Sequence, residues 1–343
     1  MKWNRFVRIM FRSVILFSMV LCASCSKYDK VEQQLELTEM NVAYMPNFGS
    51  LHDVITGVNR GIFEEEGVKV NLVEFVDGAT IIAAMESGSI DIGNIGPGAH
   101  RLPIEGRAEI ISFSQLGNAD EVLGRTDKGV RSLDDLKGKK IGLAAGTSAE
   151  AILHLALKEV GLSVNDVELV EMDASSIVSA MLSGSIDAAA TWSPNTTVIK
   201  RQLGETSITL ADNDRYKDAY PAIASYVVKA GYSQKKSEDM KKFLRGLYRS
   251  MDYRSEHMAE VVTWVAQKVG ADSDATSLEV NDGKWLTSSE LLAHLNSGEI
   301  EHYYEKQQKN FLSTGLVKSE RDVSEYVKLD LMKEILSEIS FNR

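Results

Sequence analysis

A chain of 343 residues exceeds the roughly 100–200 residues of a typical domain, which favours two lobes and leaves ample chain for a core. Hydrophobic residues at 44%, charged residues at 25% and aromatic residues at 7% argue against a disordered chain, a collagen-like repeat and a polytopic membrane protein. The net charge of −11, with no basic cluster, argues against a nucleic-acid partner. We therefore expect the partner to be a small molecule or another protein.

The N-terminus has the order of a secretory signal, with four basic residues followed by a mostly apolar run at residues 13–23. That run is too short for a comfortable transmembrane helix. Its end resembles the bacterial lipobox, in which a small residue precedes the lipidated cysteine. Cys25 fits this motif, whereas Cys22 fits it poorly because bulky Leu21 precedes it.

We therefore expect a lipoprotein signal peptide at residues 1–24, a lipid anchor on Cys25 and a polar leader at residues 25–38. An ordinary signal peptide with incidental cysteines is the alternative. Both cysteines lie in this segment, so the rest of the chain has no disulfide, thiolate nucleophile or cysteine metal site. The protein would be exported and tethered to a bacterial membrane, facing the periplasm or the cell exterior.

From Glu39 the chain alternates strand-like runs with helical patterns, which is typical of an α/β fold. The first set of elements spans Met40–Tyr44, His52–Glu66, Val68–Phe75, Thr80–Ser87, Ile90–Ile95 and Ile110–Leu116. A second set begins near residue 130 and spans Ile141–Ala145, Ser148–Val160, Val167–Met172, Ser175–Leu182 and Ile186–Thr191. Helical spacing then dominates at Asp239–Tyr253, Met258–Val269, Ser288–Ser297 and Glu301–Ser313. The pattern predicts two α/β units and a set of C-terminal helices.

An internal repeat indicates that the two units are alike. Residues Asp77–Asp91 recur as Asp173–Asp187, with nine of fifteen positions identical. Each copy has Asp at a helix N-cap, a short apolar helix, a Ser-Gly stop and Ile-Asp entering a buried strand. Convergent sequence rules of βαβ units are the alternative explanation. The repeat predicts two similar lobes, each directing a helix N-terminus toward the space between them.

Turns rich in Gly, Ser and Thr follow several predicted strands and open helices, at residues 47–50, 77–80, 94–98, 146–148, 173–176 and 192–195. In an open α/β sheet such turns lie at the carboxyl ends of strands, where ligands bind. The first-turn amides of a helix carry partial positive charge, so converging turns would form an anion site without a cationic side chain. Plain helix capping is the alternative for each turn.

Aromatic and polar residues near these turns are further ligand candidates. Trp192 ends a predicted buried strand and offers a flat wall, although core packing explains it equally well. Phe48 and Tyr226 are weaker candidates of the same kind. Asn118 and Asp120 follow an apolar strand and suit an amine on the ligand, although Asp120 could equally be a solvated turn residue.

The residues of a catalytic centre are missing from the sequence. The six histidines show no metal-ligand spacing, and there is no nucleophile elbow, P-loop or dinucleotide fingerprint. His52 and His100 stand near candidate ligand turns, whereas His154 lies mid-helix. We expect no cofactor, no metal and no enzymatic activity.

Several motifs carry a family resemblance across residues 39–327: Gly61–Phe63 with Glu66–Gly67, Phe75–Ala79, Glu86–Asp91 with Gly93–Asn94, Ser132–Lys140, and Gly184–Asp187 followed by Trp192–Pro194. They resemble the extracytoplasmic solute-binding proteins of ABC importers, in the branch for taurine, alkanesulfonates, nitrate and thiamine-precursor pyrimidines. Residues 115–118 and 192–194 look most like taurine and sulfonate binders.

The resemblance implies a type II periplasmic-binding-protein fold, in which two α/β lobes joined by two crossovers close on a ligand. The crossovers would lie near residues 125–130 and 219–225. The first lobe would comprise residues 39–127 and 222–343, including the C-terminal helices, and the second lobe residues 128–221. The ligand-binding residues expected from the turns and the resemblance together are Phe48, Gly49, Asp77, Gly78, Ala79, Thr80, Gly96, Pro97, Gly98, Asn118, Asp120, Gly146, Thr147, Ser148, Ser175, Trp192 and Tyr226.

Two departures from taurine binders bear on the substrate. Those proteins resemble one another in an acidic residue on the strand that returns to the first lobe, where this chain has Ala224. The segments 96–98 and 100–101 also replace a small polar run. Arg101 would then either meet an anion directly or form a salt bridge at the hinge.

The implied function is that of a lipid-anchored, monomeric receptor for a small organic anion or zwitterion, above all taurine or another alkanesulfonate. It would deliver this ligand to an ABC permease and its ATPase. One alternative is a binder of a thiamine-precursor pyrimidine or other heterocycle, which several aromatic residues in the cleft would favour. The other is a pyrimidine-synthesising enzyme of the same fold, against which the cysteine-free body and the export signal count.

Overall fold

Apolar runs separated by turn residues form two mixed β-sheets in the computed structural model, which describes residues 37–341. The expected signal peptide and Cys25 lie outside these residues. Sheet A has the strand order β11-β4-β10-β3-β1-β2 and comprises β1 (Thr38–Tyr44), β2 (Val68–Glu74), β3 (Ile92–Ile95), β4 (Ala108–Gly117), β10 (Ile223–Lys229) and β11 (Gly283–Lys284). Sheet B has the order β7-β6-β8-β5-β9 and comprises β5 (Asp120–Arg125), β6 (Lys140–Leu143), β7 (Glu168–Glu171), β8 (Ala188–Trp192) and β9 (Ser207–Asp212).

The two sheets share one pairing scheme. In sheet A, β1 pairs in parallel with β2 and β3, and β10 is antiparallel to β3 and β4. In sheet B, β6 pairs in parallel with β7 and β8, and β5 is antiparallel to β8 and β9. The internal repeat therefore corresponds to a repeated topology, and the prediction of two α/β lobes is confirmed.

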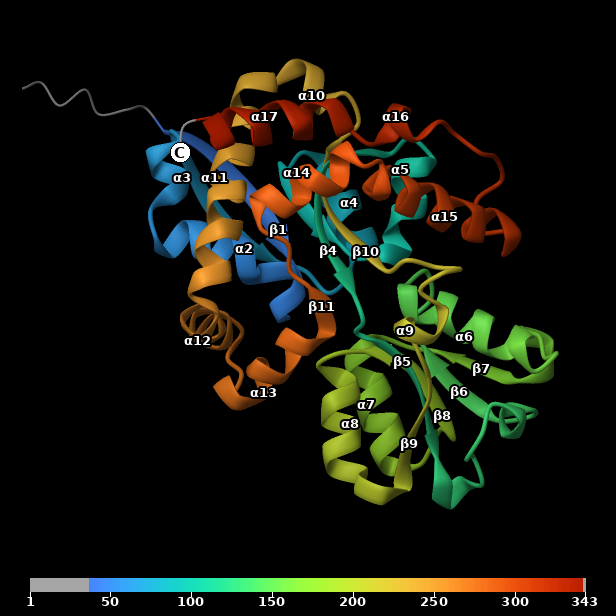
Figure 1. The fold of residues 1–343 in the computed structure, drawn as a ribbon. Coiled ribbons are helices and arrows are strands. Elements are labelled where there is room, and N and C mark those ends of the chain that lie inside the picture. Colours follow the sequence, from blue (N-terminus) through green and yellow to red (C-terminus); the bar gives the residue numbers. More distant parts are fainter. Residues whose placement is uncertain (1–36, 342–343) are drawn as a thin grey trace, which may run out of the picture. The chain divides into compact units, whose positions relative to one another are not determined.

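Helices complete each lobe (Figure 1). Sheet A and its helices form the first lobe, which includes α2 (Phe48–Asn59), α3 (Ile62–Glu65), α4 (Gly78–Ser87), η1 (Pro97–His100) and α5 (Arg101–Ile104). Sheet B and its helices form the second lobe, with η2 (Thr126–Lys128), η3 (Asp134–Leu136), α6 (Ser148–Glu159), η4 (Val164–Asp166), α7 (Ala174–Ser183), α8 (Asn195–Leu203), η5 (Gly204–Thr206) and α9 (Asn213–Tyr216). One predicted helix, 52–66, is two helices, because Gly61 adopts a left-handed φ of 69° between them.

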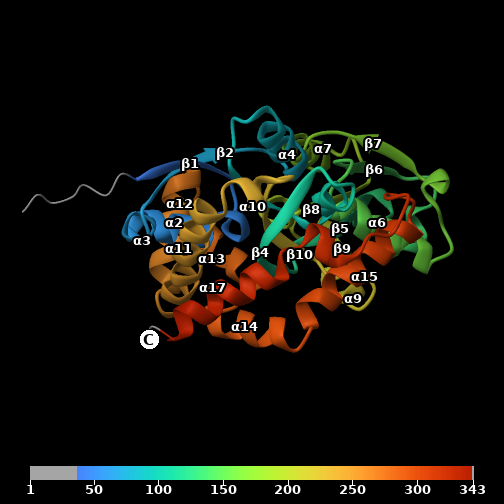
Figure 2. The same ribbon diagram turned by 90° about the horizontal axis from the view of Figure 1, so that it is seen from above.

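The C-terminal third is mainly helical, as the spacing predicts. Its elements are α10 (Tyr232–Lys235), α11 (Ser237–Glu256), α12 (Met258–Val269), α13 (Ser273–Leu278), η6 (Glu279–Asp282), α14 (Ser288–Asn296), α15 (Glu299–Ser313), α16 (Val323–Tyr326) and α17 (Leu329–Phe341). Helices α11 and α12 pack on α2, and α17 packs on β4 and α11 (Figure 2). None of the described helices is long and apolar enough to cross a membrane.

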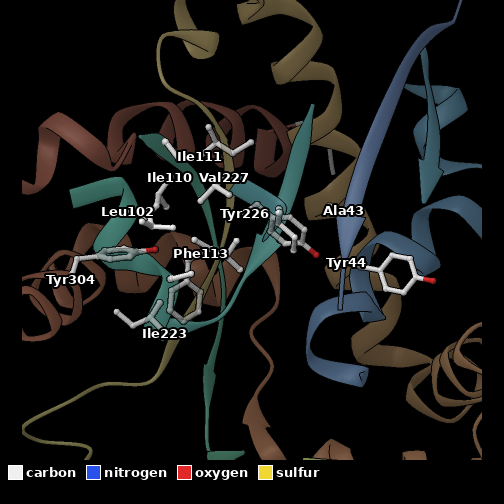
Figure 3. Close-up of a cluster of buried hydrophobic side chains, with 14 of the residues drawn as sticks. Ala43, Tyr44, Leu102, Ile110, Ile111, Phe113, Ile223, Tyr226, Val227 and Tyr304 are labelled. Atoms are coloured by element: carbon white, nitrogen blue, oxygen red, sulfur yellow. The ribbon is translucent and has the colours of Figure 1, made fainter. Parts of the chain in front are cut away.

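The core of the first lobe lies where β4 and β10 pair. Phe113 of β4 and Tyr226 of β10 are buried there beside Val227, and Tyr304 of α15 contributes from a distant part of the sequence (Figure 3). The Tyr304 hydroxyl lies 2.7 Å from the buried Ser225 hydroxyl of β10, which satisfies both groups. This packing fixes the C-terminal helices against the sheet whose turns line part of the cavity described below.

The first crossover lies elsewhere than expected. Asp120 already pairs with Trp192 of β8, so the chain passes from sheet A to sheet B at residues 118–119 and not near 125–130. The turn at Gly129, where φ is 74°, instead ends the β5 segment. Strand β5 thus belongs to sheet B, although the predicted boundary put it in the first lobe. The other predicted lobe boundaries stay predictions.

Candidate functional site

The repeated segment folds as two equivalent capped helices. The Asp77 carboxylate accepts a hydrogen bond from the Thr80 amide at 2.8 Å and caps α4. The Asp173 carboxylate accepts bonds from the Ser175 and Ser176 amides at 3.0 and 2.9 Å and caps α7. Left-handed glycines end both helices, as the sequence predicts. Each carboxylate therefore neutralises the positive end of its own helix.

A cavity of about 170 Å³ lies between the lobes and is lined from both of them. The turns after β1, β2 and β3 contribute from the first lobe, and the turns after β6 and β8 from the second. These are the carboxyl ends of parallel strands, where α/β proteins bind ligands. The volume suits a small organic solute.

Most of the expected ligand residues line this cavity. Those on its wall are Gly49, Asp77, Gly78, Ala79, Gly96, Pro97, Gly98, Asp120, Gly146, Thr147, Ser148 and Trp192. The remaining five lie elsewhere. Phe48 and Tyr226 are buried in the core, and Thr80 and Ser175 are exposed beside the aspartates that cap their helices. Asn118 turns its side-chain oxygen to the Asp214 amide at 3.0 Å.

The two lobes meet closely at one side of the cavity. A Cβ placed on Gly98 of η1 would lie 2.3 Å from the Thr147 carbonyl carbon and 2.4 Å from the Ser148 amide nitrogen. Both of these backbone atoms belong to the start of α6 in the second lobe. Glycine at position 98 therefore permits a backbone-to-backbone approach between the lobes that no other residue allows.

Asp120 is the anchor of the second-lobe wall. One of its carboxylate oxygens accepts a bond from the Ser148 hydroxyl at 2.7 Å, and the other accepts one from the Asn213 amide group at 2.9 Å. Asn213 in turn accepts from the Asp120 backbone amide at 2.7 Å. Burial raises the pKa of Asp120 to about 6. Within the described residues 37–341, Asp120 is thus held in place by neutral partners, and no cation contributes to its pKa.

Residues 279–285 supply a part of the wall that the sequence analysis missed. Glu279, Asp282 and Trp285 of this segment line the cavity. Burial raises the pKa of Glu279 to about 7 and that of Asp282 to about 6. No local motif marks these residues, because they reach the cavity through pairing of β11 with β4, more than 160 residues earlier in the chain.

Further polar residues on the wall were not named singly, although the first four lie in the predicted turns 47–50, 94–98 and 192–195: Asn47, Ser50, Asn94, Ser193 and Gln115. Asn47 could have been found, because an Asn three residues before a Ser at the start of a helical pattern is an N-cap signal; its oxygen accepts from the Ser50 amide at 2.8 Å. Asn94 and Gln115 lie on buried strands, where sequence gives no sign of which face meets a ligand.

The wall of the cavity is acidic. Asp77, Asp120, Glu279 and Asp282 line it, and no Lys, Arg or His is among its lining residues. Arg101 is not among the lining residues, but its guanidinium lies against Gly146 of the wall, and its Nε is buried without a hydrogen-bond partner. The expected hinge salt bridge of Arg101 is not seen among residues 37–341, whereas direct contact with an anion stays a prediction.

The two histidines near the predicted turns are buried away from the cavity. His100 Nδ1 lies 2.6 Å from the Gln307 side-chain oxygen, and burial lowers the pKa of His100 to about 4. His52 Nδ1 lies 2.8 Å from the Asp53 carboxylate, which also accepts a bond from Arg254. Across residues 37–341 no cluster of His, Cys, Asp and Glu could hold a metal ion.

Two lobes of matched topology around one cavity define the class of this molecule, the periplasmic-binding-protein fold. The solved periplasmic aliphatic sulphonate binding protein SsuA from Escherichia coli has a TM-score of 0.65 at 19% identity, over 86% of this chain and 99% of that chain.

The chain belongs to the NMT1/THI5-like family, whose model matches residues 51–260. A putative binding protein of Brucella abortus (strain 2308) is 30% identical over 85% of this chain and 90% of its own length. The taurine-binding periplasmic protein of Escherichia coli (strain K12) is 26% identical over 60% of this chain and 62% of its own. The resemblance stated from the sequence motifs is thereby confirmed.

Proposed function

We propose that this protein is the solute-binding component of an ABC importer. It is exported, anchored through Cys25 and carries a small ligand to a membrane permease and its ATPase. A cavity lined by two similar lobes supports this proposal, because reversible capture needs walls that can approach and separate. Relatives named as binding proteins support it as well.

The charge of the cavity wall carries the proposal about the ligand. Four carboxylates line the cavity without a cationic side chain. One helix start on the wall already has an internal acceptor, because Asp77 caps α4, and Glu150 accepts the Gly146 amide at 2.6 Å just before α6. Among the lining residues, no positive side chain offsets the repulsion that a plain anion such as nitrate would meet.

A zwitterion satisfies this wall better than a plain anion does. An ammonium group would be attracted to the acidic side chains. A sulfonate at the other end of the same ligand would meet the cavity wall at Gly96–Gly98 and Thr147–Ser148, where η1 and α6 begin without a side-chain cap. Among the ligands of the family resemblance, taurine has both groups, and we propose it ahead of amine-free alkanesulfonates.

An amino-heterocycle such as a thiamine-precursor pyrimidine is the second candidate. Two tryptophans line the cavity, Trp192 from the second lobe and Trp285 from the first. Flat indole surfaces favour a planar ring, and the carboxylates would accept bonds from its amino group. The enzyme alternative receives no such support, because the cysteines of its iron-binding motif have no counterpart in residues 37–341.

The test is a thermal-shift panel on the purified protein with taurine, ethanesulfonate, nitrate and 4-amino-5-hydroxymethyl-2-methylpyrimidine. A solute that binds only the native state raises the melting temperature. We expect taurine or the aminopyrimidine to raise it, and nitrate to leave it unchanged. The largest shift from nitrate or ethanesulfonate would contradict the proposed ligand class, and no shift from any solute would contradict the proposed function itself.

A further inference from the structure

A short segment between α13 and α14 is held beside the cavity by hydrogen bonds to its backbone. We call residues 279–286 the cleft strap. The Asp282 carbonyl accepts a bond from the Asn118 amide at 2.6 Å, and Gly283 pairs with Gly117 at the end of β4. At its far end, the buried Arg254 guanidinium donates to the Leu286 carbonyl at 2.6 Å. The strap is therefore positioned by hydrogen bonds to its own backbone at both ends. Its side chains are not needed for this attachment and can line the cavity.

The strap presents two carboxylates and an indole to the cavity. Glu279 is only 6% exposed, and its recorded hydrogen bond comes from the neutral Phe48 amide at 2.7 Å. Among residues 37–341, neither Glu279 nor Asp282 has an ion pair within 4.0 Å; Lys200 and the Ser193 hydroxyl act on Asp282, but Lys200 forms its ion pair with Glu121. A buried carboxylate without a positive partner is costly, and this cost would be offset by a cation bound in the cavity.

Trp285 is held rigidly beside these carboxylates. Its ring nitrogen donates to the Val280 carbonyl at 2.7 Å, and its ring stands edge-on to Phe48 and His52 at centroid distances of 5.2 and 4.7 Å. An indole fixed in this way can interact through its face with a cation near Glu279 or Asp282.

An independent observation on β3, another strand of sheet A, points to the same chemistry. Asn94 of β3 lines the cavity and is 1% exposed, and its side-chain oxygen has no hydrogen-bond partner. Its amide nitrogen donates to the Ser114 hydroxyl at 3.1 Å, which leaves the oxygen as the group available to a ligand. An unsatisfied acceptor and two carboxylates without an ion pair within 4.0 Å together favour a ligand with hydrogen-bond donors.

We infer that Glu279 and Asp282, with the Trp285 ring, form a subsite for a protonated nitrogen group of the ligand: an ammonium, an amidinium or a protonated aminopyrimidine. This inference rests on the proposed function and assigns the part of the cavity that recognises nitrogen. Ala224, where taurine binders resemble one another in an acidic residue, also lines the cavity and pairs with Gln115 of β4. The strap pairs with the same strand at Gly117, from its other side, and thus supplies acidity close to that position.

The test compares matched ligands and matched variants by titration calorimetry. The ligand pairs are taurine with ethanesulfonate, and 4-aminopyrimidine with pyrimidine; the members of each pair differ by one amino group. The variants are Glu279→Gln and Asp282→Asn, and the control is Glu290→Gln. Glu290 caps α14 through Thr287 outside the cavity, and Gln retains this capping geometry while removing one charge.

In at least one pair, we expect the compound with the amino group to bind at least tenfold more tightly than its partner. Either strap variant should weaken that member tenfold or more, whereas Glu290→Gln should change its affinity less than twofold. Melting curves of all variants show whether each remains folded. If Glu279→Gln does not fold, Asp282→Asn alone tests the subsite. Equal affinity within both pairs, no binding of either taurine or 4-aminopyrimidine, or full affinity in both strap variants would overturn the subsite.

These outcomes separate the subsite from the proposed function. If ethanesulfonate and pyrimidine each bind as tightly as their amino-bearing partners, the subsite is refuted and a solute-binding role stands. If no compound of either pair or of the wider panel binds, both are refuted.

Discussion

Glu279 gives up solvation on folding without gaining a cation, which makes the stability of the protein sensitive to pH. Burial raises its pKa from 4.5 to about 7, so the folded state favours the protonated carboxyl group. The stabilising contribution of this proton is complete below about pH 4.5 and is lost as the pH rises through about 7. Above that range the ionised group destabilises the empty protein.

Glu279→Gln is therefore expected to stabilise the ligand-free protein at pH 8 and not at pH 4.5. Glutamine keeps an oxygen for the Phe48 amide and carries no charge at either pH. The shift from 4.5 to about 7 sets an upper limit of about 3 kcal/mol on the gain. Chemical denaturation of both proteins at the two pH values checks this, and an equal difference at pH 4.5 and pH 8 would contradict it.

Ligand binding should show the opposite dependence on pH. A cation prefers ionised carboxylates, and burial places the pKa of Asp282 at about 6 and that of Glu279 at about 7. Glu121 and Lys200 also act on Asp282, with opposite sign, and Asp282 acts on Glu279. Affinity for taurine, whose ammonium group stays protonated over this range, should rise about tenfold or more between pH 5 and pH 8 as measured by calorimetry. Affinity that falls over this range would contradict the assigned chemistry.

Asn213 is expected to be essential to the second-lobe wall. It makes two bonds to Asp120, one to the backbone amide and one to the carboxylate. Asn213→Ala leaves a buried carboxylate and a buried amide without these partners and should lower the free energy of unfolding by about 1–3 kcal/mol. The exposed Asn281 provides the control, and Asn281→Ala should change it by less than about 0.5 kcal/mol. Comparable losses in the two variants would refute the role of Asn213.

The sequence predicts the structural role of some residues and not that of others. Asp77 and Asp173 are N-caps because an aspartate stands before an apolar helical pattern that ends at Ser-Gly, and the structure confirms both. Glu279 and Asp282 have no such local signal, because burial beside a cavity depends on strand pairing across the whole chain. Phe48 follows a turn that lines the cavity, but the helix that it begins turns its ring into the core.

At the scale of elements, η1 and the start of α6 control how near the lobes come. Gly98 allows the two backbones to touch, whereas Gly96, in the same turn, has open space where a Cβ would lie. Neither glycine has a positive φ, so alanine adds bulk without backbone strain. The two glycines are therefore a matched pair for testing whether approach of the lobes is required for binding.

Gly98→Ala should weaken ligand binding at least tenfold, about 1.4 kcal/mol, because its methyl group would collide with Thr147 and Ser148. Gly96→Ala should leave affinity within about twofold. The melting temperature without ligand should change little in either variant, because each lobe keeps its own core. Calorimetry gives the affinities, and equal affinity of the two variants would show that the contact at Gly98 is not needed.

Helices and strands with a strong hydrophobic periodicity lie where the sequence predicts them. The position of a boundary between two lobes is predicted less well. The helices of the repeat appear where predicted, because cap, apolar face and stop signal agree. The first crossover was placed too late because Asp120–Arg125 continues the β-like run of the preceding strand. Only the pairing of β5 with β8 and β9 shows that it belongs to the other sheet.

At the scale of the whole molecule, the repeated sequence predicts the paired sheet topologies, and the described residues 37–341 bear this out. What the sequence could not predict is the sign of the charge inside the cavity. Glycine-rich turns suggest an anion site, yet carboxylates from the same turns and from the cleft strap line the space. Local sequence patterns identify the turns that line the cavity. The tertiary fold determines which other side chains line the cavity beside those turns.

The most direct test of the account is a calorimetric titration of the purified protein, and of Gly98→Ala, with taurine and with 4-amino-5-hydroxymethyl-2-methylpyrimidine. We predict that one of these solutes binds one-to-one, weakens at least tenfold in Gly98→Ala and is recovered chemically unchanged. Absence of one-to-one binding by either solute, or conversion of the solute into a product, would contradict the account.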